Sequence, residues 1–218
     1  MKKIIIISIF TLFVLFFMVN KKTGNNQPIV ETYPWQVIIL PDGRSRVFGI
    51  VFGETILKEV DGILNSQPKI ALFEVDEKLS LEAYYKNVSL GGMIGSFIVT
   101  LDASTEQLNK IKKESVKQKR AEIKGKRYEL DKLASDSTKR LAVKNLIYIP
   151  TVQLDEQIII KRFGKPTYKI KLKTKEVGWH YLYPEKGLDL IYKEEGKEVL
   201  QYVLPKHFNE LLEPLQSR

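Results

Sequence analysis

Residue types that perform catalytic chemistry are sparse in this sequence. The 218 residues include only two histidines, His180 and His207, and no cysteine. Neither histidine lies in a spacing typical of metal ligands. The sequence also lacks a Gly-x-Ser-x-Gly nucleophile motif, a phosphate-binding loop and a dinucleotide fingerprint. We therefore expect a protein that is not an enzyme and needs no cofactor or metal. The alternative is a hydrolase whose catalytic Ser, Asp and His come together only when the chain folds.

Three aromatic residues indicate binding chemistry instead. Trp179, Tyr181 and Tyr183 alternate along one predicted strand, so their side chains share one face of it. Tryptophan and tyrosine are the usual anchors of protein interfaces, which makes these residues candidates for binding a partner. The same alternation is typical of rings that pack in a core, and the spacing does not separate the two interpretations.

Cations at regular spacings form two candidate sites for an anionic surface. One is a predicted strand in which every second residue is a lysine, and the other is a predicted basic helix. Such lysines could bind anionic lipid or an acidic partner. They could equally be a solvated helix face and a strand edge protected against pairing with other edges. A nucleic-acid partner is not expected, because the helix lacks interleaved aromatic residues. The candidate residues are Lys110, Lys113, Lys117, Arg120, Lys169, Lys171 and Lys173.

The last third of the chain has the clearest secondary-structure signals. Asp155 is a good N-cap for a helix whose buried side is Ile158, Ile159 and Phe163, and Gly164 with Pro166 should end it. A short closing helix is expected near the end of the chain. The predicted strands are Thr167–Thr174, Trp179–Tyr183, Leu188–Tyr192 and Val199–Leu204, and the closing helix is His207–Leu212.

The first half follows a similar plan. Pro41-Asp42-Gly43 predicts a hairpin turn, and Thr55 is a plausible N-cap for a short helix that Pro68 stops. The predicted strands are Gln36–Leu40, Arg46–Ile50, Ile70–Val75, Leu79–Tyr85 and Met93–Leu101.

A strongly basic segment separates the two halves. Ser104 and Gln107 have the spacing of a capping box, and the helix they open is predicted to run towards Gly125. The stretch Glu106–Arg127 holds nine Lys or Arg against three Glu, a net charge of +6 in a chain of net +9. A second short helix around Thr138–Lys144 and a strand over Leu146–Ile149 complete the segment.

The order of helix, proline and antiparallel strands occurs twice, which indicates an internal repeat. In the second copy, a helix ending Phe-Gly-Lys-Pro is followed by Trp-His-Tyr. This pattern resembles small outer-membrane assembly lipoproteins of the SmpA/BamE type, and its tandem arrangement is similar to the β-lactamase inhibitory proteins. The resemblance implies fold more than function, and the chain departs from it in having no lipid-bearing cysteine. The matching residues are Asp155, Ile159, Phe163, Gly164, Pro166, Trp179 and Tyr181.

Residues 4–19 are sixteen uncharged residues between Lys2-Lys3 and Lys21-Lys22. A cleaved signal peptide would need small residues at the exit of this run, and none is there. A spanning helix of this length is short, but snorkelling lysines could extend it. We expect an uncleaved signal-anchor, with a cleaved leader or a segment buried in protein as alternatives. The lysines on the two flanks nearly balance, so they do not decide the orientation in the membrane. We expect the N-terminus in the cytoplasm, because short basic N-termini usually stay there.

Together these observations predict an α+β fold, with an N-terminal transmembrane helix followed by two modules, each a short helix plus an antiparallel sheet. The expected role is a binding or scaffolding protein of the bacterial inner membrane, with a single pass and its body in the periplasm. It would recognise an envelope protein through a sheet face. The alternatives are a peripheral factor that binds anionic lipid and an envelope hydrolase. The expected boundaries are 1–22 for the anchor, 23–32 for a stalk, 33–103 and 146–218 for the modules, and 104–145 for the connector.

Overall fold

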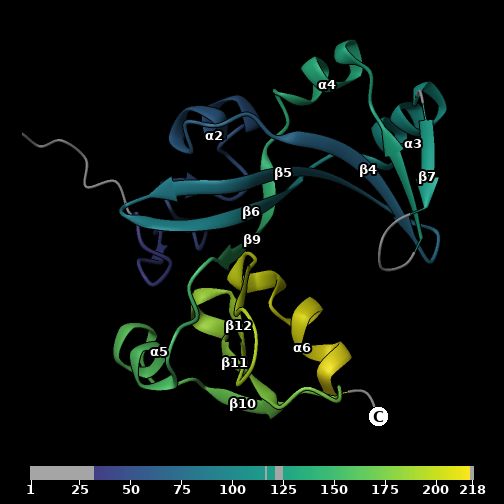
Figure 1. Cartoon of the computed structure of the whole chain (residues 1–218). Coiled ribbons are helices and arrows are strands. Elements are labelled where there is room, and N and C mark those ends of the chain that lie inside the picture. Colours follow the sequence, from purple (N-terminus) through teal and green to yellow (C-terminus); the bar gives the residue numbers. More distant parts are fainter. Residues whose placement is uncertain (1–31, 116, 121–124, 217–218) are drawn as a thin grey trace, which may run out of the picture. The chain divides into compact units, whose positions relative to one another are not determined.

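The computed structural model of the chain describes residues 32–115, 117–120 and 125–216 (Figure 1). Its first elements form a small antiparallel sheet of β1 (Ile38–Ile39), β2 (Ser45–Val47) and β3 (Ile50–Val51). Asp42 supports the turn between β1 and β2 by accepting a hydrogen bond from the backbone N–H of Arg44, at 3.0 Å. The hairpin predicted at this turn is confirmed, but the single strand predicted over Arg46–Ile50 is wrong, because a turn at Phe48 and Gly49 divides it into β2 and β3.

Helix α2 (Leu57–Ile63) follows, and then a meander of β4 (Lys69–Val75), β5 (Lys78–Leu90) and β6 (Met93–Leu101). The N-cap of α2 is Ile56, one residue later than predicted, and the Glu59 side chain accepts its backbone N–H at 2.9 Å. The hydroxyl of Thr55 instead accepts the backbone N–H of Val51. The three strands of the meander agree with the prediction.

Helix α3 (Thr105–Glu114) opens with the predicted capping box of Ser104 and Gln107, but it ends well before Gly125. The chain then forms a hairpin of β7 (Lys117–Arg120) and β8 (Lys126–Glu129), and β8 pairs with β4. The predicted continuous basic helix is therefore wrong. Its charged second half has no apolar stripe to hold a helix on the core, whereas the buried ring of Tyr128 fixes β8 there.

The next elements are α4 (Lys132–Thr138), capped by Asp131, and the strand β9 (Val143–Pro150). The helix predicted over Thr138–Lys144 is wrong, because helix α4 ends at Thr138 and β9 has already begun at Val143. The strand predicted over Leu146–Ile149 is confirmed.

The C-terminal part begins with α5 (Glu156–Phe163), which has the predicted N-cap: Asp155 accepts the backbone N–H of Gln157 at 2.6 Å. The antiparallel strands that follow agree with the predicted ones, and the closing helix lies slightly later than predicted. These elements are β10 (Tyr168–Lys171), β11 (Gly178–Tyr183), the short η1 (Pro184–Lys186), β12 (Leu188–Lys193), β13 (Val199–Tyr202), η2 (Pro205–His207) and α6 (Asn209–Gln216).

All strands from β4 onwards belong to one ten-stranded antiparallel sheet, in the order β10-β11-β12-β13-β9-β6-β5-β4-β8-β7. Strand β9 joins the two halves, because it pairs with β6 on one side and with β13 on the other. The predicted fold class is corrected by this pairing: the halves are not separate helix-plus-sheet modules but parts of one mainly β structure.

One face of this sheet carries the main hydrophobic core. Helices α2, α3 and α5 and the small β1–β3 sheet all contribute to it, through residues such as Leu57, Ile111, Phe163 and Phe48. The core is continuous from Leu72 on β4 to Tyr181 on β11 within a single cluster. A second, smaller cluster lies under α6, where Phe208 and leucines of the helix cover Leu182 and Val203.

The predicted membrane span at residues 4–19 lies outside the described residues. Among residues 32–115, 117–120 and 125–216, no helix combines the length and the apolar character needed to cross a membrane.

Candidate functional site

Helix α6 covers the second face of the sheet at Leu182 and Val203, whereas over β5, β6 and β9 this face has no buried side chain. Along β5, the buried residues Leu81, Ala83 and Tyr85 alternate with Ser80, Glu82 and Tyr84, none of which is buried. The same alternation continues on β6 and β9. We call the resulting surface the open face; it consists of Phe73, Ser80, Glu82, Tyr84, Ser96, Ile98, Thr100, Asn145, Ile147 and Ile149.

Strand register places apolar side chains of the open face in one row. Tyr84 pairs with Ile98, Ile98 with Ile147, and Ile147 with Gln201. The Tyr84 side chain is 37% exposed, and Ile98 and Ile147 are half-buried between their neighbours. Direct cross-strand neighbours have Cβ atoms about 5 Å apart, so the row is a continuous apolar strip across β5, β6 and β9.

A polar row runs beside this strip. Glu82 pairs with Thr100, and Thr100 pairs with Asn145. The hydroxyl of Ser80 donates a hydrogen bond to Glu82, at 2.8 Å. Partial burial raises the pKa of the Glu82 carboxyl, and the Ser80 hydrogen bond acts in the opposite direction. The open face thus combines apolar contact area with hydrogen-bonding groups.

The three aromatic residues predicted to bind a partner lie on the covered face. Tyr181 and Tyr183 are 1% and 0% exposed, and Trp179 is half-buried. Helix α5 covers them: the Tyr183 hydroxyl donates to the carbonyl of Gly164 at 2.9 Å, and the Tyr181 hydroxyl donates to Glu156. The expected platform is therefore corrected to core packing for both tyrosines, since buried rings present no surface to a partner.

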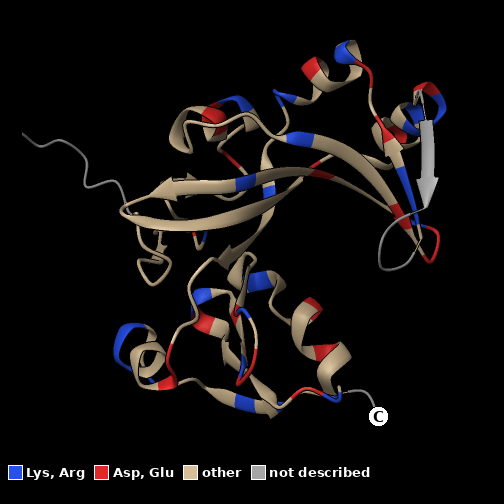
Figure 2. Ribbon diagram, in the orientation of Figure 1, with Lys and Arg blue, Asp and Glu red and all other residues tan. Residues whose placement is uncertain are grey.

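The lysines predicted to face an anion do not form one surface. Lys110 and Lys113 are exposed on α3, whereas Lys169 and Lys171 are exposed on β10, and Figure 2 shows blue cations on both elements. β10 lies at one end of the sheet order, whereas α3 contacts β4 and β5. Lys173 follows β10, and Lys117 and Arg120 lie on β7, where the structure describes the backbone only.

Lys169 is held within its own chain. Its ammonium lies 3.0 Å from a Glu156 carboxylate oxygen, and 4.6 Å and 5.0 Å from the ring centroids of Trp179 and Tyr181. The hydrogen bonds from Tyr181 and Lys169 lower the pKa of the Glu156 carboxyl. The positive charge of Lys169 therefore has a partner within the chain and does not require an external anion.

The two histidines lie apart. His180 points away from the main core, and its Nδ1 is 2.9 Å from the buried carboxylate of Asp189. Burial raises the pKa of Asp189, and the contacts with His180 act against that shift. His207 is paired with Glu210 on the surface. In the part of the chain that the structure describes, neither histidine is hydrogen-bonded to a serine, and no three His, Asp or Glu side chains cluster as metal ligands do.

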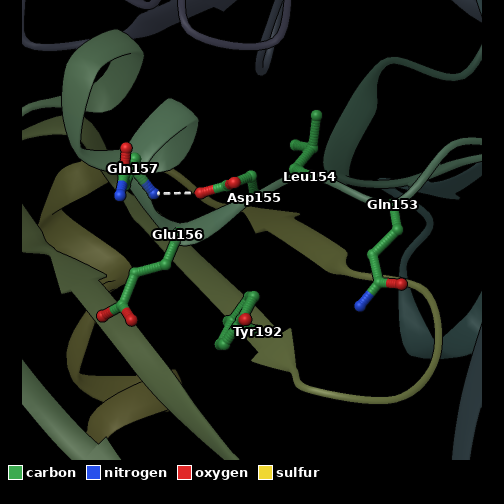
Figure 3. A pocket seen from close by; sticks show the side chains of 6 residues that line it. All are labelled: Gln153, Leu154, Asp155, Glu156, Gln157 and Tyr192. Carbon is green, nitrogen blue, oxygen red and sulfur yellow. Dashed lines mark hydrogen bonds between the residues drawn. The ribbon is translucent and has the colours of Figure 1, made fainter.

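An open pocket of about 470 Å³ lies where α5 begins (Figure 3). Its lining combines the loop before the helix, the first two residues of the helix and a tyrosine of β12. Sequence analysis missed this site because β12 follows the loop by some forty residues, and only folding brings Tyr192 to Asp155. The acidic pair Asp155-Glu156 was the sole local signal. The lining residues are Gln153, Leu154, Asp155, Glu156, Gln157 and Tyr192.

Comparison with protein-family models, curated proteins and solved structures finds no match to this chain. The resemblance to the SmpA/BamE type, the location in the bacterial inner membrane and the periplasmic body therefore stay predictions.

Proposed function

We propose that the protein is a non-enzymatic binding module that recognises a protein partner through the open face. The observation that carries this proposal is the apolar row across three central strands, in which Tyr84 is exposed and Ile98 and Ile147 are half-buried. Strands in the middle of a sheet are normally covered on both faces or polar on the uncovered one. Here the uncovered face keeps isoleucines and a tyrosine at neighbouring positions.

The composition of the open face suits a protein partner. Interfaces combine an apolar centre with a polar rim and are poor in charged residues at the centre. Ile98, Ile147 and Tyr84 would form such a centre, and Ser80, Thr100 and Asn145 supply hydrogen-bonding groups beside it. Because the backbone here is already ordered in a ten-stranded sheet, little further ordering of it is needed on binding.

Site-specific photo-cross-linking in producing cells tests the proposal. A photoreactive residue at Tyr84 or Ile98 should give a discrete cross-linked protein, because both side chains would lie in the interface. The matched control is Ile158 on α5, on the other side of the sheet. Its predicted burial is wrong, because its side chain is 46% exposed. A partner cross-linked equally from all three positions, or from none, would refute this role for the open face.

A binding measurement with the identified partner completes the test. Ile147→Glu places a charge in the centre of the open face, and we expect it to weaken binding by about a hundredfold or more. Ile158→Glu makes the same substitution on α5 and should leave affinity within about twofold. Unchanged affinity in the folded Ile147→Glu variant would contradict the proposal.

A further inference from the structure

The small sheet ends in an edge strand, β1, that buries neither of its faces. Ile38 and Ile39 lie on opposite faces, because successive residues of a strand alternate. Both side chains are nonetheless exposed, at 38% and 42%. The neighbouring strand β2 differs, since Ser45 and Val47 are buried and Arg46 between them is half-buried. β1 therefore presents apolar surface on both sides.

The backbone of β1 also has hydrogen-bonding groups on its outer side. Leu40 donates its N–H to the carbonyl of Arg44 at 2.8 Å, across the pair of β1 and β2. Alternate residues of an antiparallel strand direct both backbone groups to the same neighbour, so those of Val37 and Ile39 point away from β2. Among the residues that the structure describes, none is hydrogen-bonded to these outward groups. The edge is thus a template for one more strand.

The other sheet edges carry protection that β1 lacks. β10 and β7 are the edges of the ten-stranded sheet; β10 includes Lys169 and Lys171, and β7 reads Lys-Gln-Lys-Arg. Charged residues, lysine above all, keep edge strands from pairing with other chains. On β3, the far edge of the small sheet, the N–H of Val51 donates to the Thr55 hydroxyl. The segment Gln36–Leu40 holds neither a charged residue nor a proline.

A second β1 strand fits this edge without repulsion. In an antiparallel pair, the outward groups of Val37 bond those of Ile39 in the other copy, and symmetry repeats these bonds. Ile38 then lies opposite Ile38 of the other copy at a two-fold axis, as a pair without hydrogen bonds whose Cα atoms are about 4.5 Å apart. The contact is apolar on both sides, whereas β10 paired with itself would set lysine against lysine.

We propose that the outer edge of β1 binds β1 of a second copy of this chain, so that two three-stranded sheets become one six-stranded sheet. No charge in the strand selects a partner of opposite charge, and the two-fold axis uses every contact twice. Because few residues of each copy take part, we expect a weak dimer, with a dissociation constant on the order of 100 µM. This proposal does not depend on the open face or on its partner.

Cysteine cross-linking tests the register, and the chain has no cysteine of its own. Ile38→Cys places two thiols opposite each other at a Cα separation that suits a disulfide, so mild oxidation of the full chain should give a covalent dimer. Ile39→Cys places its thiols diagonally and should cross-link at least about fivefold less. Ile158→Cys, at the isoleucine 46% exposed on α5, is the control and should give only background. Equal cross-linking from all three positions, or none from Ile38→Cys, would overturn the proposal.

Photo-cross-linking in producing cells tests the choice of occupant. A photoreactive residue in place of Ile38 should join two copies of this chain. A cross-link to a different protein only would assign the edge of β1 to that partner and overturn the proposal.

Sedimentation of the full chain in a non-ionic detergent measures the dimer directly. Ile39→Lys gives β1 the protection that β10 has, and it should raise the dissociation constant at least about tenfold. Ile158→Lys is the matched control and should change it by less than about twofold. Association through the apolar residues 4–19 would be the same in all variants. Equal dissociation constants in the folded Ile39→Lys and parent proteins, or a parent that stays monomeric well above the expected constant, would also overturn the proposal.

Discussion

At the scale of single residues, Asp61 on α2 is a buried acid with two side-chain partners on other elements. It accepts a hydrogen bond from the Tyr85 hydroxyl at 2.7 Å and forms an ion pair with Lys139. Burial raises the pKa of Tyr85 far above its usual value, and the Asp61 carboxylate adds to that shift. The aspartate thus ties α2 to the centre of β5 and to the end of α4.

We predict unequal costs for removing the two ends of the Asp61–Tyr85 hydrogen bond. Tyr85→Phe removes one neutral donor and should reduce the free energy of unfolding by about 1 kcal/mol. Asp61→Ala should cost about 3 kcal/mol, because it leaves the Tyr85 hydroxyl and the Lys139 ammonium without their partner. Urea denaturation measures both values. If both variants lost the same free energy of unfolding, hydration of the Lys139 ammonium would fully replace its ion pair with Asp61, and the prediction would be wrong.

A second prediction at this scale concerns Glu198 and pH. Its folded-state pKa is raised above the ordinary value of 4.5 by burial. As pH rises above about 4.5, the unfolded chain therefore loses this proton before the native protein does, and native stability falls. Glu198→Gln removes the effect, so its stability relative to the parent should increase between about pH 4 and about pH 7. A constant difference across that range, measured by urea denaturation, would contradict the raised pKa.

At the scale of elements, strand β6 depends on close approach to β9. A Cβ atom on Gly95 would lie 2.2 Å from the ring of Tyr148 and 2.8 Å from the carbonyl oxygen of Ile149. Gly62 on α2 is the opposite case, since a Cβ there would have no neighbour within 4 Å. Neither glycine has a positive φ angle, so the two positions differ in space and not in backbone conformation.

We predict opposite effects of alanine at these two glycines. Gly95→Ala should destabilise the protein by about 2 kcal/mol or more, because β6 must move away from β9 or Tyr148 must leave its rotamer. Gly62→Ala should stabilise it by about 0.5–1 kcal/mol, through lower backbone entropy of the unfolded chain. Thermal or chemical unfolding of both variants gives the comparison. A stabilised Gly95→Ala protein would mean that β6 and β9 are not packed as described.

Elements with a complete local signal are those that the sequence predicts well. Ser104 with Gln107, and Asp155 before an amphipathic segment, mark helix starts without reference to the rest of the molecule. The β7–β8 hairpin has no such signal. Lys117–Arg120 is too polar to show a period, and it becomes a strand only because β8 beside it pairs with β4.

The candidate sites were likewise predictable only as far as local sequence signals reached. Alternation along a strand shows which side chains share a face, and it places Trp179, Tyr181 and Tyr183 together. It does not show which face a helix will cover, and α5 covers theirs. The open face was hidden for the same reason: Tyr84 and Ile98 lie on neighbouring strands only after pairing has set the register.

At the scale of the whole molecule, the continuous sheet makes the two halves depend on one another. Strand β9 is hydrogen-bonded to both, and the main core extends through it by way of Leu146 and Tyr148. The sequence suggested two modules because each half repeats the same order of elements. A repeated order of helices and strands does not show whether one strand pairs with both halves. Strand partners are set by contacts between residues that are distant in the chain.

We predict that the described part of the molecule unfolds in one cooperative transition. Trp35 reports on the N-terminal segment packed against Phe163, and Trp179 reports on β11, so tryptophan fluorescence and far-UV circular dichroism should give the same midpoint. Leu146→Ala, at a fully buried position of β9, should lower that midpoint in both signals, at a cost of about 3 kcal/mol. Two separate unfolding transitions would contradict this prediction and show that the two halves unfold independently.

The place of β9 also has a consequence for biosynthesis. A ribosome delivers residues 69–101 long before residues 143–150, so β6 emerges with its outer edge unpaired. Until β9 arrives, that edge is a template for any other extended chain nearby, including another nascent copy. Slow translation between the two segments would lengthen this exposed interval and favour aggregation, and faster delivery of β9 would shorten it.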